Sequence, residues 1–200
     1  MPSVPPSIAC VILAAGAGRR AGGPKAFLPF SDVTTSVEET FLAHVARVAR
    51  EGGAAPIVAV VRPQDRDRAA AATPGLALAV NPDPERGMLS SLRAGLDALA
   101  PVAGVLIFPV DPPHVRPGTV GALLQAFDAD PSTGAKPSFE GRGGHPVVLP
   151  WVLAESLPAA DVPGGLGEAL RQAGARVAFV PVDDPGVLRN VNGLADRGPG

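Results

Sequence analysis

Short and almost wholly apolar runs recur along this chain of 200 residues, and segments long enough for helices separate most of them. Runs without polar interruption are typical of strands that are buried on both faces of a parallel sheet. Strands that alternate with helices build right-handed crossover units, so the pattern predicts an α/β fold with a largely parallel sheet. The expected strands are 8–14, 56–61, 76–80, 105–110 and 177–182, with two further extended segments within 138–149.

Helix signals stand between these runs. Ser36 and Glu39 have the spacing of a capping box, and apolar residues follow at helical intervals until Gly52. Pro63 suits the first turn of an alanine-rich helix, because its missing N–H is not needed there. Further helices are expected at 88–99, 117–127 and 165–172.

The composition is that of a single globular domain. Hydrophobic residues make up 46% of the chain and charged residues 18%, which a disordered protein would not show. No segment has the character of an interdomain linker, so one domain is expected over 8–196, after a flexible lead-in at 1–7. The net charge of −2 offers no broad basic face, and a nucleic-acid partner is therefore not expected.

The single cysteine, Cys10, lies in the first apolar run and is expected to be a core residue, since it has no second cysteine to pair with. The run 8–15 is far too short to cross a bilayer. No basic segment precedes it, so it does not have the pattern of a secretion signal. The expected location is the cytoplasm, without a membrane partner.

A loop rich in glycine and cations follows the first expected strand. Glycines let backbone N–H groups turn toward an anion, arginine can bind phosphate oxygens as a fork, and lysine supplies a point charge. In open α/β sheets, ligands bind beyond the carboxyl ends of the strands, where this loop begins. The loop therefore predicts a polyphosphate site. Its candidate residues are Leu13, Ala14, Ala15, Gly16, Gly18, Arg19, Arg20 and Lys25.

The loop has two other possible interpretations. Gly16, Gly18 and Ala21 partly match the dinucleotide-binding fingerprint of dehydrogenases, but that motif runs directly into a helix. Here the segment 22–24, Gly-Gly-Pro, opposes a helix. The structural alternative is a glycine-rich surface turn with incidental charges, and the close grouping of three cations on the glycines speaks against it.

Polar residues that follow other expected strands are the next candidates. Asp111 ends the run 105–110, where a carboxylate can hold Mg²⁺, although Asp-Pro-Pro by itself is equally consistent with a simple strand-ending turn. Ser90 and Ser91 stand at a helix start, where they could bind a ligand or merely cap the helix. Asn81 follows the third strand and is a candidate for reading the base.

The segment 13–29 resembles the signature of the MobA-like NTP transferases, with Leu-Ala-Ala-Gly, Arg-Arg and Pro-Lys in the spacing of that family. Within the superfamily the chain is most similar to the molybdenum cofactor cytidylyltransferases. Three further segments match motifs of that group in the same order: 87–96, 110–115 and 141–146. Together the four motifs cover most of the chain.

The resemblance implies a three-layer, Rossmann-like nucleotidyltransferase fold with a mixed, mostly parallel sheet. It also implies a Mg²⁺-dependent transfer of CMP from CTP to a phosphorylated acceptor, molybdopterin, with release of pyrophosphate. Catalysis would rest on positioning and charge stabilisation by Arg19, Arg20, Lys25 and a metal on Asp111. Possible protein partners are a molybdoenzyme or its chaperone.

The resemblance assigns the remaining sites as well. Asn190 would be a second metal ligand, and Ser90 and Ser91 would line the base and ribose pocket. The acceptor side would be formed by Gly144, His145 and Pro146, with the histidine on a constrained turn. A histidine in such a place more often has a structural hydrogen-bonding role, so both interpretations of His145 stay open.

Two stretches depart from the pattern of the cytidylyltransferases. Asn190 stands where they have an aspartate, and the Thr-Pro that follows in them is missing from 190–196. The segment 164–169 lacks an acid and an arginine that are expected near the acceptor. These departures keep other acceptors open: a sugar phosphate, methylerythritol phosphate or a guanylyl-type acceptor. A catalytically degenerate protein that binds a nucleotide or cofactor is the remaining alternative.

Overall fold

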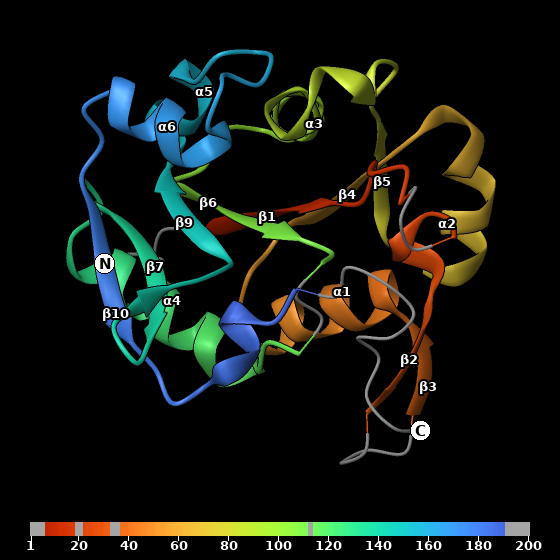
Figure 1. Cartoon of the computed structure of the whole chain (residues 1–200), viewed down its shortest axis with the longest axis horizontal. Helices are drawn as coiled ribbons and strands as arrows, with labels where there is room; N and C mark the ends of the chain where they lie inside the picture. The colour runs from red at the N-terminus through yellow and green to blue at the C-terminus, as the bar shows by residue number, and fades with distance from the viewer. Residues whose placement is uncertain (1–6, 19–21, 33–36, 112–113, 191–200) are drawn as a thin grey trace, which may run out of the picture.

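A sheet of eight strands separates two layers of helices in the computed structural model (Figure 1), which describes residues 7–18, 22–32, 37–111 and 114–190. The lead-in at 1–6 and the segment 191–196 lie outside these described residues. The strands of the sheet are β1 (Ile8–Leu13), β4 (Ile57–Val61), β5 (Ala77–Val80), β6 (Gly104–Pro109), β7 (Gly134–Phe139), β8 (Arg142–Gly143), β9 (Val147–Pro150) and β10 (Val177–Pro181).

The strand order is β10-β7-β9-β6-β1-β4-β5, with β8 paired to β7 outside this path. β1 pairs in parallel with both β4 and β6, and β4 pairs in parallel with β5. β9 runs antiparallel to β6 and β7, whereas β7 and β10 are parallel. The predicted mixed and mostly parallel sheet is confirmed, and every expected strand is present.

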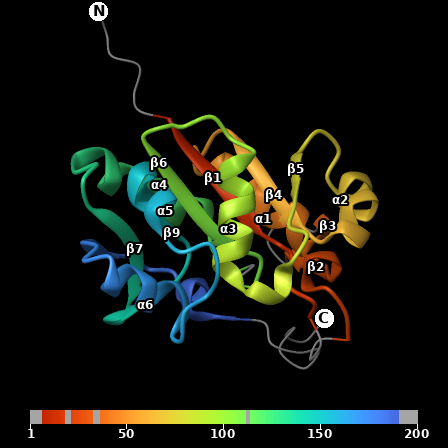
Figure 2. The same ribbon diagram turned by 90° about the horizontal axis from the view of Figure 1, so that it is seen from above.

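The helices cover both faces of the sheet (Figure 2), and each layer has its own apolar core. One layer contains α1 (Phe41–Glu51), α2 (Arg66–Ala72) and α4 (Pro117–Ala129), and the other contains α3 (Met88–Asp97), α5 (Trp151–Ser156) and α6 (Gly165–Gln172). Gly95 lets α3 approach the sheet closely, because a Cβ there would overlap the Val11 side chain of β1. This three-layer arrangement is the predicted one.

The segment 37–40 corrects the sequence-based expectation. It forms β3 (Val37–Thr40), which pairs antiparallel with β2 (Pro29–Asp32), and α1 begins only at Phe41. Thr40 caps the helix, since its Oγ1 accepts a hydrogen bond from the Ala43 amide at 3.2 Å. The helix start predicted from a capping box of Ser36 and Glu39 is wrong, because Glu39 lies in β3 and its carboxylate accepts a hydrogen bond from Arg47 at 2.8 Å; Ser36 lies outside the described residues. Strand pairing with β2 outweighed the local helix signal.

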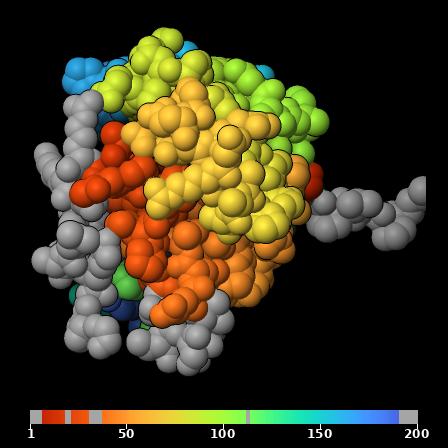
Figure 3. Space-filling model, turned by 90° about the vertical axis from the view of Figure 1, so that its right-hand side faces the viewer, coloured from red at the N-terminus to blue at the C-terminus, as the bar shows by residue number. Residues whose placement is uncertain are grey.

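The β2–β3 hairpin lies beside α2 at one edge of the molecule (Figure 3), where the hairpin is orange and α2 is yellow. Arg68 of α2 stacks on the ring of Phe27, 4.3 Å from its centroid. Phe27 belongs to a 3₁₀ turn, Lys25–Phe27, between β1 and the hairpin. The packing of α2 on this turn therefore supports the end of the glycine-rich loop.

Cys10 is fully buried in β1, as predicted, and its burial raises the pKa of the thiol far above its ordinary value. The helices in the described part of the chain are too short or too polar to cross a membrane.

Candidate functional site

A cavity of about 430 Å³ opens beyond the carboxyl ends of β1 and β6. Its walls come from the glycine-rich loop, the end of β6 and the start of α3, which are far apart in the sequence. The lining residues are Leu13, Ala15, Gly16, Gly18, Lys25, Pro84, Gly87, Met88, Ser91, Pro109, Val110 and Asp111. Three of the predicted motifs thus meet at one place.

The glycine-rich loop has a backbone that other residues would strain. Gly18 has a φ of 59°, and a Cβ there would overlap the carbonyl oxygen of Gly23. The Gly23 amide donates a hydrogen bond to the Gly18 carbonyl at 3.2 Å and closes the loop. Arg19 and Arg20 lie outside the described residues.

The loop continues into the 3₁₀ turn Lys25–Phe27 and the hairpin, and among the described residues the next α-helix begins at Phe41. A dinucleotide-binding fingerprint needs an α-helix directly after its glycines, with the helix N-terminus facing the pyrophosphate. Residues 22–24 form no helix and lead into the 3₁₀ turn, as their Gly-Gly-Pro sequence predicted, while residues 19–21 lie outside the described residues.

Lys25 and Asp111 form an ion pair on the cavity wall. The Nζ of Lys25 lies 2.9 Å from Oδ2 of Asp111, and the exposed fractions of the two side chains are 14% and 42%. Asp111 follows β6 and Lys25 follows the glycine-rich loop, so the parallel pairing of β1 with β6 brings the two charges together. An incoming phosphate would compete for the lysine, and an incoming cation would compete for the carboxylate.

Asn81 is buried behind the wall of the first cavity and forms hydrogen bonds with the residues around the start of α3. Its amide nitrogen donates to the hydroxyls of Ser90 and Ser91 at 2.8 and 3.0 Å. Its carbonyl oxygen accepts from the Asp83 amide at 2.9 Å. Ser91 lines the cavity, whereas Asn81 and Ser90 are not among its lining residues. In this structure the polar groups of Asn81 hold the loop before α3, and reading of the base by Asn81 stays a prediction.

The start of α3 has a cap that sequence reasoning missed. Gly87 is the N-cap residue and has no side chain, so Asp161 from the α5–α6 connection supplies the acceptor. Its Oδ1 accepts from the Leu89 amide at 2.8 Å. Asp161 and Leu89 are 72 residues apart, so no local motif could have identified this contact.

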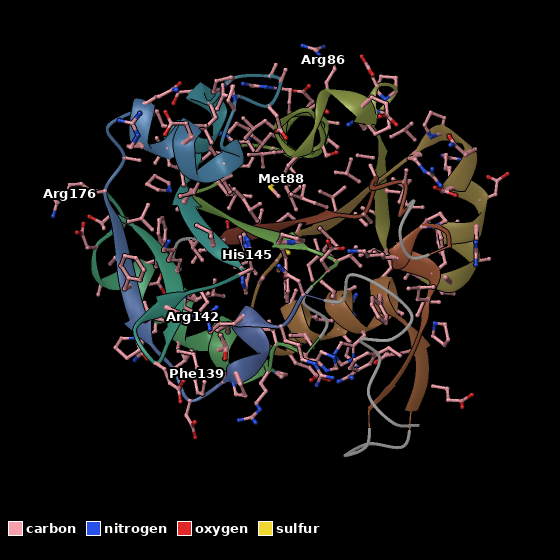
Figure 4. The ribbon with its side chains drawn as sticks, in the orientation of Figure 1. Arg86, Met88, Phe139, Arg142, His145 and Arg176 are labelled. Atoms are coloured by element: carbon pink, nitrogen blue, oxygen red, sulfur yellow. The ribbon has the colours of Figure 1, made fainter. Side chains whose placement is uncertain are left out.

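His145 lies at a second cavity of about 420 Å³, on the β7, β9 and α6 side of the molecule. Its lining residues are Lys136, Gly143, Gly144, His145, Val147, Leu166, Gly167, Leu170, Arg171, Ala175, Val177 and Phe179. Figure 4 shows His145 and Met88 toward the middle of the view, while Arg86 and Arg176 point outward at the rim.

Backbone contacts hold the His145 segment in place. A Cβ on Gly144 would overlap the carbonyl of Val187, and the His145 amide donates to that carbonyl at 3.0 Å. Burial lowers the pKa of His145, the charge of Lys136 lowers it further, and the charge of Asp111 opposes both effects. The Nδ1 atom is buried and has no hydrogen-bond partner among the described residues. The buried Pro146 follows through a cis peptide bond.

The second predicted metal ligand, Asn190, is exposed and is the last described residue. In the described ranges, His, Cys, Asp and Glu side chains form no group of three or more that could hold a metal ion. A metal at Asp111 would therefore rely on few protein ligands, and the pairing of Asp111 with Asn190 stays a prediction.

Solved structures share this fold over nearly the whole chain. A Mycobacterium tuberculosis Rv0371c homologue from Mycobacterium sp. strain JC1 is 23% identical, with a TM-score of 0.77 over 94% of this chain and 92% of that one. Rv0371c from Mycobacterium tuberculosis in complex with manganese is 23% identical, with a TM-score of 0.69 over 90% and 89%. A CMP:2-keto-3-deoxy-manno-octonic acid synthetase complexed with CTP is 16% identical, with a TM-score of 0.73 over 94% of each chain. At these identities the likeness shows the fold.

Two curated relatives are closer in sequence. Nicotine blue oxidoreductase from Paenarthrobacter nicotinovorans is 34% identical over 196 residues, which cover 94% of this chain and 93% of the relative. The bifunctional enzyme IspD/IspF from Ruegeria pomeroyi is 35% identical over 137 residues, which cover 66% of this chain and 33% of the relative.

The family comparison covers the described cavity and both halves of the sheet. Residues 10–177 match the MobA-like NTP transferase domain. The match includes the glycine-rich loop, Lys25, Asp111 and the His145 segment. The chain therefore belongs to the MobA-like NTP transferase domain family of nucleotidyltransferases.

Proposed function

We propose that this protein transfers CMP from CTP to a phosphorylated acceptor, in a Mg²⁺-dependent reaction that releases pyrophosphate. The observation that carries the proposal is the first cavity, where the glycine-rich loop, Lys25, Asp111 and Ser91 come together. A cavity with cationic and amide donors at the carboxyl edge of a parallel sheet suits a nucleoside triphosphate. The choice of cytosine rests on the resemblance of the loop to the cytidylyl type.

The residues of the chain would act by positioning and charge. The loop amides and Lys25 hold the β- and γ-phosphates, so that an acceptor phosphate oxygen can attack the α-phosphorus in line. A bond forms between that oxygen and the α-phosphorus, and the bond from the α-phosphorus to the bridging oxygen breaks. The bridging oxygen keeps the electron pair and leaves as part of pyrophosphate. When CTP binds, Lys25 leaves its ion pair with Asp111 and binds phosphate oxygens instead. Arg19 and Arg20 are proposed to add positive charge beside the same phosphates.

Asp111 fits the role of a metal ligand. Its carboxylate lines the cavity and is 42% exposed, and Mg²⁺ usually takes only one or two carboxylates plus phosphate oxygens and waters. Asn190 is proposed as the second ligand. Held by these residues, Mg²⁺ would supply positive charge that offsets the charge developing on the leaving pyrophosphate. Rv0371c, whose solved structure has a similar fold, was determined in complex with manganese.

The acceptor is proposed to bind at Gly144, His145 and Pro146, beside the second cavity. Burial lowers the pKa of His145, which favours the neutral imidazole, and its Nδ1 has no hydrogen-bond partner among the described residues. Molybdopterin is the acceptor that the motifs favour, and a molybdoenzyme or its chaperone would then receive the product. A sugar phosphate, methylerythritol phosphate and a guanylyl-type acceptor are the alternatives with the same chemistry.

The test is pyrophosphate release from each nucleoside triphosphate, with each candidate acceptor, in the presence and absence of Mg²⁺. CTP with Mg²⁺ is expected to give turnover, and Lys25→Ala is expected to reduce it by about 10²- to 10³-fold, as the loss of one charge-stabilising donor does. Arg50→Ala, at an exposed position on α1, is the control and should keep full turnover. Near-normal turnover of Lys25→Ala would contradict the mechanism.

A redox reaction is the second candidate, and the 34% identity to nicotine blue oxidoreductase over 94% of the chain favours it. In that case the first cavity would hold the pyrophosphate of a nicotinamide dinucleotide. The turn after the glycine-rich loop opposes this binding mode, since the described residues 22–27 contain no α-helix N-terminus. Oxidation of NADH or NADPH by the protein with an electron acceptor, without any Mg²⁺-dependent pyrophosphate release, would decide for the redox candidate.

A further inference from the structure

Asp161 lines neither cavity, but it lies between a segment that lines the first cavity and a segment that lines the second. Asp161 lies in the connection between α5 and α6, where α6 supplies Leu166, Gly167, Leu170 and Arg171 to the second cavity. On its other side Asp161 contacts the start of α3, which supplies Gly87, Met88 and Ser91 to the first cavity. One residue is therefore in contact with the wall of one cavity and linked through a short turn to the wall of the other.

Three contacts fix Asp161 against α3. Its Oδ1 accepts from the Leu89 amide at 2.8 Å, and its own amide donates to the Arg86 carbonyl at 2.9 Å. Gly87, with a φ of 93°, is packed so closely that a Cβ there would overlap the Asp161 carboxylate. The carboxylate also lies at the positive end of the α3 dipole, where a negative charge is favourable. The position of Gly87 and Met88 thus depends on Asp161.

The link from Asp161 to α6 is short and closed by a hydrogen bond. The Gly165 amide donates to the Val162 carbonyl at 2.8 Å, and α6 begins at Gly165. Arg93 of α3 supports the same connection, because its guanidinium donates to the Leu157 carbonyl at 3.2 Å. The connection is therefore held on α3 at Leu157 and at Asp161, and residues 162–164 lead from Asp161 directly into α6.

We propose that Asp161 is a positioning residue that holds the nucleotide-facing start of α3 and couples it to the α6 wall of the second cavity. The structural part of this inference concerns the free protein, and its effect on nucleotide binding rests on the proposed function. Asp161 is exposed and contributes little to either apolar core, so its replacement should loosen these two walls without unfolding the chain.

The test compares Asp161→Ala with Asp161→Asn, Gly87→Ala and the control Asp97→Ala. The asparagine keeps an oxygen that can accept from the Leu89 amide, and the alanine of Gly87→Ala would push against the carboxylate. Asp97 carries the same charge at the other end of α3, is exposed, and has no side-chain hydrogen bond to the described residues. Its removal therefore controls for the loss of charge alone.

Hydrogen–deuterium exchange of the free proteins is the first measurement. Asp161→Ala and Gly87→Ala are expected to speed amide exchange in residues 84–91 and 162–172 by about fivefold, which corresponds to the loss of a helix cap. Asp161→Asn and Asp97→Ala are expected to exchange like the parent protein. Unchanged exchange in either segment, or a rise throughout the chain, would overturn the coupling.

Calorimetric titration of CTP with Mg²⁺ is the second measurement. Asp161→Ala is expected to raise the Kd about fivefold, with Asp161→Asn restoring most of the affinity. A Kd that stays unchanged while exchange rises would mean that Asp161 has only a structural role. If the parent protein binds no nucleotide, the proposed function fails, and the exchange data still decide whether Asp161 couples the two walls.

Discussion

At the scale of single residues, the Lys25–Asp111 pair shows how this site balances opposite charges before a ligand is bound. Lys25 is proposed to bind phosphate and Asp111 to bind a metal, so each side chain needs a partner of opposite charge. Without a ligand each is the partner of the other, with the Lys25 Nζ and the Asp111 Oδ2 2.9 Å apart. Both charges stay satisfied on a partly exposed wall, so neither carries the full cost of an unpaired charge in a cavity. The ligand that replaces this pair must bring its own negative and positive groups, as a metal–triphosphate complex does.

His145 makes the stability of the fold depend on pH. Its folded pKa lies below the ordinary value of 6.5, mainly because burial disfavours the charged ring. Below about pH 6.5 the unfolded chain therefore binds a proton that the folded chain does not bind at this position, and the free energy of unfolding falls as pH falls toward the folded pKa. Above pH 6.5 both states hold neutral imidazole and this contribution is constant.

Urea unfolding of the parent protein and of His145→Asn at several values between about pH 7.5 and pH 5 measures this effect. The difference in unfolding free energy between the two proteins should shrink as pH falls, because the asparagine does not titrate. A difference that is constant across this range would show that His145 titrates equally in both states.

At the scale of elements, the conformation of the glycine-rich loop depends on Gly18 more than on the number of glycines in the loop. Gly18 has a positive φ and lies against the Gly23 carbonyl, while a Cβ on Gly16 would meet nothing within 4 Å. Gly18→Ala is expected to lower the free energy of unfolding by about 1–3 kcal/mol, the cost of a strained backbone position.

Gly16→Ala in the same loop is the matched comparison. It should change the free energy of unfolding by less than about 0.5 kcal/mol, as is usual for a substitution that disturbs no contact. Chemical denaturation of both variants measures the two values. Equal destabilisation by both would show that the loop does not keep the closed form that the Gly23–Gly18 hydrogen bond gives it.

At the scale of the whole molecule, the first cavity is lined by the glycine-rich loop, by the ends of β1 and β6 and by the start of α3, so a ligand that binds the folded protein there should stabilise the fold. A ligand at 100 times its Kd adds about 2.7 kcal/mol to the free energy of unfolding. Thermal unfolding with CTP, GTP, UTP and ATP, each with and without Mg²⁺, is expected to show the largest rise in Tm for CTP with Mg²⁺.

NADH and NADPH belong in the same thermal series, because they separate the two candidate functions. A rise in Tm with a dinucleotide and none with a triphosphate would favour the redox candidate. No rise with any nucleotide would instead favour a degenerate member, or a protein that binds its acceptor first.

The sequence by itself determined those features that depend on local pattern. Continuous apolar runs predicted the strands, and β1, β4 and β6 are buried as such runs indicate, whereas the run of β10 forms an edge strand on which Phe179 is exposed. The Gly-Gly-Pro of 22–24 predicted the break after the glycine-rich loop, because glycine and proline oppose the interior of a helix. The motifs also predicted which residues meet, since the glycine-rich loop and Asp111 follow strands that proved to be neighbours.

Only the tertiary structure decided how those residues are used. The Lys25–Asp111 pair joins positions 86 residues apart, and the cap of α3 comes from Asp161, 72 residues from the amide it accepts from. The segment 37–40 became a strand because β2 lay beside it, although its own residues favoured a helix start. Contacts of this kind depend on the order of strands in the sheet and on which chain segments lie side by side, and local propensity carries no information about either.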